Sequence, residues 1–138
     1  MKFSAYASLF FTCIFLLACS AKTSDEDEVR ALVGAVEAAA EARDTSDVLE
    51  HVADNYADSS GFDKSQLHNF LRGYFLAHPR LELLVRIESL EFPVDGLAQA
   101  VISVTTVDIT DPGAQRLKVE FRHSASSWQV VRADRMTR

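Results

Sequence analysis

The chain has 138 residues, 48% of them hydrophobic, and its 20 acidic residues outnumber its 14 lysines and arginines to give a net charge of −6. This length suits one ordinary domain with its own hydrophobic core. The negative charge argues against a partner made of nucleic acid, because phosphate backbones select surfaces rich in lysine and arginine.

The first eighteen residues have the layout of a secretory signal. Lys2 supplies one positive charge, and residues 3–18 then run without any charged side chain. A transmembrane helix needs about 20 apolar residues, whereas this run is shorter and a polar, acidic segment follows it directly. We therefore predict a cleaved signal peptide over residues 1–18.

The end of this apolar run resembles a bacterial lipobox. Leu16-Leu17-Ala18-Cys19 places a leucine three residues before the cysteine and a small residue directly before it. The resemblance implies cleavage before Cys19, lipidation of its sulfur and acylation of its amine with chains such as palmitate. Ser20, in place of an aspartate, implies sorting to the outer membrane, on the periplasmic side. An ordinary signal that happens to contain a cysteine is the alternative.

Cleavage at this point leaves a lipidated cysteine and tether over residues 19–23 and a domain over residues 24–138. Cys13 is lost with the signal and the sulfur of Cys19 is lipidated, so no thiol remains for a disulfide, a metal site or a nucleophile. The domain must then be stabilised by its core alone. We also expect it to bind no cofactor.

Helical periodicity predicts two helices after the tether. Ser24 and Asp27 have the spacing of a capping box at the start of the first helix, whose apolar stripe runs to Ala40. The segment Arg43-Asp44-Thr45 interrupts the pattern, and a shorter helix around residues 48–52 follows it.

A third helix has the clearest boundaries in the sequence. Asp63 and Gln66 have the reciprocal spacing of a capping box at its start. His78-Pro79 predicts its end, because a residue that precedes proline avoids the α region.

From Arg80 the hydrophobic period changes to two, which predicts four strands joined by tight turns. The expected strands cover residues 80–88, 97–109, 116–123 and 128–133, with turns at 93–96, 111–113 and 124–127. Helices followed by strands indicate an α+β domain, with three N-terminal helices packed on a curved four-stranded antiparallel sheet.

The third expected strand shows the strictest alternation. Its apolar phase, which we predict to face the helices, consists of Leu117, Val119, Phe121 and His123. Its polar phase, which we predict to face water, consists of Arg116, Lys118, Glu120 and Arg122. A slip of one residue would bury four charged side chains together.

The order of elements resembles the NTF2-like superfamily, the cone-shaped fold of ketosteroid isomerase and SnoaL-type cyclases. The residues that carry the resemblance are Glu41-Ala42-Arg43-Asp44, Leu49, Tyr56-Ala57-Asp58, Leu67-His68-Asn69-Phe70-Leu71 and Trp128-Gln129-Val130-Val131. The resemblance implies a cone that encloses a pocket and an exposed sheet face that can form homodimers.

Some members of this superfamily catalyse proton transfer or dehydration, which requires a base and an oxyanion donor facing one cavity. The isomerase-like enzymes place a tyrosine donor on the first helix, but residues 24–43 contain no tyrosine. Asp54, Asp58 and Asp108 remain as candidate bases, and ordinary solvation at loops and strand ends also explains them. We predict a non-catalytic module that binds a small apolar ligand or a protein partner; the alternative is an isomerase or dehydratase acting on a small apolar substrate.

The expected pocket has its floor on the third strand and its mouth near His123. Tyr56, Tyr74 and Trp128 are the other candidate pocket residues, and the competing interpretation makes these aromatic side chains part of the core. No metal site is expected, because the four histidines lack ligand spacing and the polar loop at 54–61 fails the EF-hand spacing.

Overall fold

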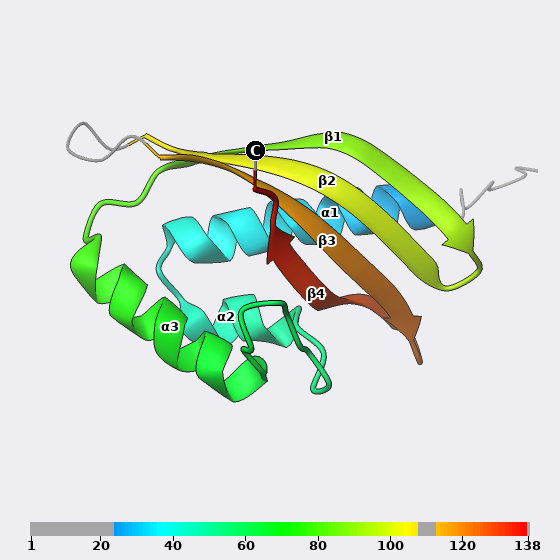
Figure 1. Ribbon diagram of the computed structural model, residues 1–138, viewed down its shortest axis with the longest axis horizontal. Helices are drawn as coiled ribbons and strands as arrows, with labels where there is room; N and C mark the ends of the chain where they lie inside the picture. Colours follow the sequence, from blue (N-terminus) through cyan, green and yellow to red (C-terminus); the bar gives the residue numbers. More distant parts are fainter. Residues whose placement is uncertain (1–23, 108–112, 138) are drawn as a thin grey trace, which may run out of the picture.

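The computed structural model describes residues 24–107 and 113–137. Three helices precede a meander of four antiparallel strands, whose order in the sheet is β1-β2-β3-β4. The helices are α1 (Asp25–Glu41), α2 (Thr45–Glu50) and α3 (Lys64–Ala77), and the strands are β1 (Leu83–Val94), β2 (Leu97–Thr106), β3 (Ala114–Ser124) and β4 (Ser127–Arg135). The curved sheet arches over the helices (Figure 1), which confirms the α+β prediction.

The predicted signal peptide at 1–18, the tether and Cys19 lie outside the described residues. No helix in the part of the chain that the structure describes is both long and apolar enough to cross a membrane.

Short-range hydrogen bonds set the helix boundaries that the sequence predicts. The Ser24 side chain accepts from the backbone N–H of Asp27 at 3.2 Å. Asp63 and Gln66 form both bonds of a capping box, at 2.8 and 2.9 Å. Helix α3 ends at Ala77, directly before the His78-Pro79 pair. The N-cap at Ser24, the capping box at Asp63 and the end of α3 are confirmed, whereas at Ser24 the structure gives only the N-cap bond of the predicted box. In each case the residues involved lie within three positions of one another in the chain.

The strands differ from the predicted ranges mainly at their ends. Strand β1 begins at Leu83 rather than at Arg80, because Leu81 packs into a buried cluster with Phe75. It also continues through the expected turn to Val94, and Gly96 supplies the positive φ of +75° that the tighter turn requires. Strand β2 ends at Thr106, and the predicted strand end and turn at 108–112 lie outside the described residues.

The larger core cluster lies between α1 and the sheet. Val29 is fully buried and Phe121 is 1% exposed at its centre. Val119 is buried with them, while Arg116, Lys118 and Arg122 are exposed, as the alternation in β3 predicts. His123 pairs with the buried Trp128 and so shares the inner face, but it is exposed because it lies next to the β3–β4 turn, at the end of the strand.

Both edges of the sheet are hydrogen-bonded to other parts of the chain. On β1, Leu83 donates to Glu41 Oε1 at 2.9 Å and Val85 donates to Glu37 Oε1 at 3.3 Å. On β4, the carbonyl of Val130 accepts from the backbone N–H of Ala53 at 2.9 Å, and Val130 forms a parallel β-bridge with Val52 in the segment after α2. These bonds satisfy strand-edge groups that would otherwise invite pairing with another chain, and they hold α1 and the 51–57 segment beside the sheet.

Candidate functional site

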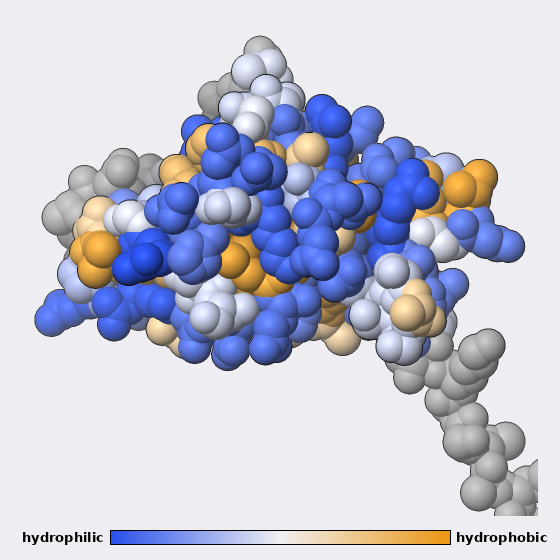
Figure 2. All heavy atoms as spheres, turned by 90° about the horizontal axis from the view of Figure 1, so that it is seen from below, coloured by the Kyte–Doolittle hydropathy of each residue, from blue (hydrophilic) through white to orange (hydrophobic). Residues whose placement is uncertain are grey.

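An apolar cavity of about 260 Å³, which we call the inner cavity, lies between the helices and the concave face of the sheet. Aliphatic side chains from α1, α3 and all four strands line most of it, among them Leu32, Val33, Val36, Leu67, Leu71, Val85, Val104, Leu117, Val119 and Val130. Seen from the helix side, hydrophobic atoms are visible at the centre of the surface and hydrophilic side chains surround them (Figure 2). The floor of the cavity therefore comes from the sheet, including the apolar phase of β3, as predicted.

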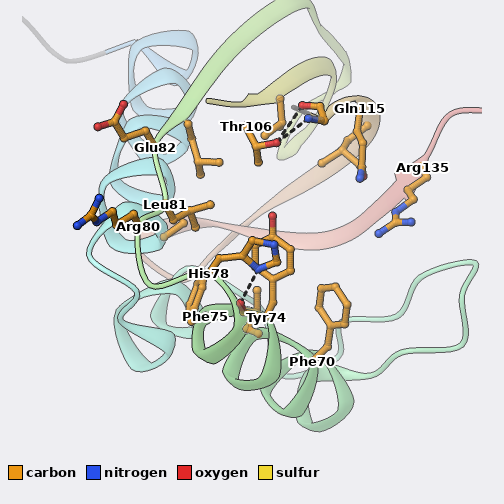
Figure 3. Close-up of a pocket in the computed structure, with 16 residues that line it drawn as sticks. Phe70, Tyr74, Phe75, His78, Arg80, Leu81, Glu82, Thr106, Gln115 and Arg135 are labelled. Atoms are coloured by element: carbon orange, nitrogen blue, oxygen red, sulfur yellow. Dashed lines mark hydrogen bonds between the residues drawn. The ribbon is translucent and has the colours of Figure 1, made fainter. Parts of the chain in front are cut away.

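A second cavity of about 390 Å³, which we call the mouth, adjoins the inner cavity. The two cavities share lining residues, among them Leu71, Val104 and Leu117. The mouth is more polar, because the side chains of Tyr74, His78, Gln115 and Arg135 also line it. In Figure 3, Tyr74 rises from α3 and Arg135 extends from β4 towards the same open space.

Two polar side chains reach the inner cavity, and both are hydrogen-bonded to the protein. Tyr56 as a whole is 3% exposed, and its hydroxyl donates to Asp58 Oδ2 at 2.8 Å. The Glu37 carboxylate accepts from the backbone of Val85 at the cavity wall. Neither group is arranged as a base facing an oxyanion donor across the cavity, which proton-transfer chemistry requires.

Burial strongly raises the pKa of the Tyr56 hydroxyl, and its hydrogen bond to Asp58 raises it further. An unfolded tyrosine titrates near pH 10, so above about pH 10 the folded chain binds one more proton here than the unfolded chain. The free energy of unfolding is therefore expected to fall as pH rises above about 10.

Tyr56→Phe tests this expectation. Urea unfolding of the wild type and the variant, compared between about pH 8 and pH 11, should show a steeper loss of stability in the wild type. The variant should also be less stable near neutral pH by about 1 kcal/mol, because it lacks the hydrogen bond to Asp58. Equal slopes in the two chains would contradict this role for Tyr56.

The aspartates considered as bases have structural partners. Asp54 pairs with Lys64 at 2.9 Å, and Asp58 Oδ1 accepts from two backbone N–H groups in its own loop. Asp134, which the sequence did not single out, accepts from the backbone of Ser59 at 2.7 Å and pairs with Arg132. Burial opposes ionisation of Asp134, but these bonds hold its pKa below the usual value. These aspartates therefore stabilise the 54–61 loop. The other candidate base, Asp108, lies outside the described residues.

The four predicted pocket residues occupy different places. Tyr56 lines the inner cavity and Tyr74 lines the mouth. His123 lines a separate surface groove together with Arg122. Trp128 is buried in the core, and the centroid of its ring lies 5.3 Å from that of the His123 ring. The mouth therefore lies beside Tyr74, at the end of the sheet where β1 begins, and not beside His123. Within the described residues, no group of three His, Cys, Asp or Glu side chains is placed to hold a metal ion.

The comparisons with known proteins show the fold. No family model matches the chain, and no curated protein matches it. A solved structure from Thiobacillus denitrificans, described as a calcium/calmodulin-dependent protein kinase type II association domain, is 22% identical and superposes with a TM-score of 0.64 over 78% of this chain and 94% of that one. An NTF2-like protein of unknown function from Shewanella oneidensis is 14% identical, with a TM-score of 0.67 over 81% of this chain and 98% of that one.

A third structure, from Nostoc punctiforme, is a domain of unknown function with a cystatin-like fold. It is 12% identical, with a TM-score of 0.71 over 85% of this chain and 79% of that one. Similarity at these identities establishes architecture and does not establish activity. The domain has the NTF2-like α+β fold that the sequence predicts, a cone with its cavity between helices and sheet.

Proposed function

We propose that this chain is a lipid-anchored protein of the bacterial cell envelope whose NTF2-like domain binds a small apolar ligand without catalysing its conversion. The observation that carries the ligand proposal is the inner cavity, whose lining is apolar except for Glu37 and Tyr56. A largely preformed, mostly apolar cavity is the usual form of a site for a small ligand.

Binding is favoured over catalysis because of what the polar groups in this lining do. Tyr56 donates to Asp58, and Glu37 accepts from the edge of β1. Both side chains therefore support the walls of the cavity. An isomerase or dehydratase would instead need an acid or base directed at the substrate.

A small ligand is also favoured over a protein partner on the outer face of the sheet. That face carries ion pairs between Arg116 and Glu88 and between Arg122 and Glu120. The cores of stable protein interfaces are depleted of charged side chains. The charged pairs on the outer face therefore disfavour a buried protein interface there.

The proposal for the anchor rests on the lipobox-like sequence before Cys19. Helix α1 is capped at Ser24, so the tether between the anchor and the domain has only a few residues. Such a tether spans about 15–20 Å when fully extended. The domain would therefore remain close to the membrane surface, where apolar ligands partition.

Filling the inner cavity is expected to abolish ligand binding. Leu117 lines both cavities and is half-buried, so Leu117→Trp would place an indole ring where the ligand lies. The probe is 1-octanol, titrated into the full chain in lipid nanodiscs while the NMR signals of isotope-labelled methyl groups are recorded. We expect the methyl groups of Leu71 and Val104 to shift in the wild type and to stay unchanged in the variant.

Leu84→Trp is the matched control, because Leu84 is 63% exposed on the opposite face of the sheet. A thermal melt of each chain separates loss of binding from loss of folding, since overpacking costs about 1–3 kcal/mol. A wild type whose cavity methyl groups do not respond to 1-octanol would contradict the proposed function, and so would equal binding by wild type and Leu117→Trp.

A further inference from the structure

The inner face of the sheet changes from apolar to polar at the end that forms the mouth. The strand register pairs Leu83 with Thr106, Val104 with Gln115 and Leu117 with Arg135. Side chains of directly paired residues on neighbouring strands project from the same face. Thr106, Gln115 and Arg135 therefore extend the face that lines the inner cavity, and all three line the mouth.

A β-bulge in β4 gives Arg135 this inward position. Phe121 pairs with Val130 whereas Glu120 pairs with Arg132, so Val131 is an extra residue in the strand. The extra residue reverses the alternation for the rest of β4. As a result Arg132 lies on the outer face and Arg135 lies on the inner one.

Arg135 also differs from the outer-face arginines in its partners. Arg116 and Arg132 pair with Glu88 and Asp134, respectively. Among the described residues Arg135 forms no ion pair, and Figure 3 shows its guanidinium directed towards the space above α3. In the same view the other charged side chains of the mouth, Arg80 and Glu82, point away from that space.

Helix α3 supplies the opposite side of the mouth. The Tyr74 and His78 rings stack with centroids 4.1 Å apart, and His78 Nδ1 lies 2.8 Å from the Tyr74 backbone oxygen. That oxygen can only accept a hydrogen bond, so Nδ1 carries the hydrogen and the imidazole is fixed in orientation. The Tyr74 hydroxyl extends into the space that Arg135 faces (Figure 3).

The inner cavity, in contrast, disfavours an anion. Glu37 is the charged side chain in its lining, and the remaining lining is almost wholly apolar. A negatively charged group would be repelled by that carboxylate and would lose its hydration there. A ligand with one anionic end would therefore be oriented with its charge at the mouth.

We propose that the mouth binds the anionic head of a small amphiphile, such as a carboxylate, through Arg135 and the Tyr74 hydroxyl, while the apolar tail lies in the inner cavity. This inference rests on the proposed function and adds the ligand class and its orientation. Guanidinium groups bind carboxylates through paired, charge-assisted hydrogen bonds.

The test compares two probes that share a tail and differ in the head, octanoate and 1-octanol. Each is titrated into the full chain in nanodiscs, with the methyl groups of Leu71 and Val104 as reporters and protein-free nanodiscs as the correction for lipid partition. We expect octanoate to bind about tenfold more tightly, and added salt should reduce this preference because the mouth is open to solvent.

Arg135→Gln should remove the preference by weakening octanoate binding about tenfold while leaving the affinity for 1-octanol unchanged. Arg86→Gln is the matched control, because Arg86 is an exposed arginine in β1 that does not line the mouth. Unchanged octanoate binding in Arg135→Gln, or equal binding of the two probes by the wild type, would overturn the inference while the proposed function survived. Absence of binding by both probes would overturn the proposed function itself.

Discussion

Replacing Phe121 by alanine is expected to lower the free energy of unfolding by about 3–5 kcal/mol, the usual cost of removing a fully buried phenylalanine. Phe121 is 1% exposed, and it packs in the cluster that joins α1 to the sheet with Val29 and Trp128. The side chain also lines the inner cavity. Its loss would enlarge a space that the neighbouring strands, fixed by their hydrogen bonds, cannot collapse to fill.

Chemical denaturation and thermal melting measure this effect, and a loss of this size corresponds to a Tm lower by about 10–20 °C. Phe92→Ala is the matched control, because Phe92 is 39% exposed on β1 and touches Trp128 only at its edge. We expect the control to lose less than half as much stability. Similar losses in the two variants would contradict the placement of Phe121 at the centre of the core.

The sequence predicts those parts of the fold that depend on neighbouring residues. The caps at Ser24 and Asp63 and the end of α3 before Pro79 involve partners only a few positions apart. Local hydrogen bonds and steric restrictions of this kind act in any tertiary context. The positions of these helix ends can therefore be predicted from the sequence alone.

The orientation of β3 is predictable for an energetic reason. The inward phase contains Val119 and Phe121, and the outward phase contains several charged side chains. Burial of an unpaired charge costs several kcal/mol, whereas a whole domain is stable by only about 5–15 kcal/mol. One orientation is therefore far more stable than the other, whatever the partner strands are.

The polar end of the site depends on features that the sequence does not display. Alternation counted from Trp128 places even-numbered residues of β4 on the inner face, which would put Arg135 outside. The bulge at Val131 reverses this count, and the carbonyl of Val131 accepts from Ala57, a residue more than seventy positions away. A bulge stabilised by so distant a partner leaves little signal in the local sequence.

The predicted position of the mouth is incorrect for a related reason. His123 belongs to the inward phase of β3, but it lies beside the β3–β4 turn, where it is exposed. The mouth instead forms where α3 ends, and Tyr74 and His78 meet the other end of the sheet there. Periodicity assigns a side chain to a face, but only the packing of the helices decides which part of that face is covered.

Cys19→Ser is expected to abolish lipidation and signal cleavage together. Under the proposed lipobox, Cys19 would be the acceptor of the lipid and the first residue of the mature chain, and serine has no thiol to form the thioether. Each buried methylene contributes about 0.8 kcal/mol to membrane binding, so two or more acyl chains anchor a protein firmly, whereas one anchors it weakly.

Intact-mass spectrometry of the membrane fraction distinguishes the products. The wild type should begin at Cys19 and carry additional acyl mass, whereas Cys19→Ser should retain residues 1–18 and carry none. Cys13→Ser is the matched control, because Cys13 lies in the same apolar run but not at the proposed cleavage point, so it should be processed like the wild type. A soluble wild-type chain cleaved at another position would contradict the anchor, and the proposed amphiphilic ligand would then have to reach the domain away from the membrane surface.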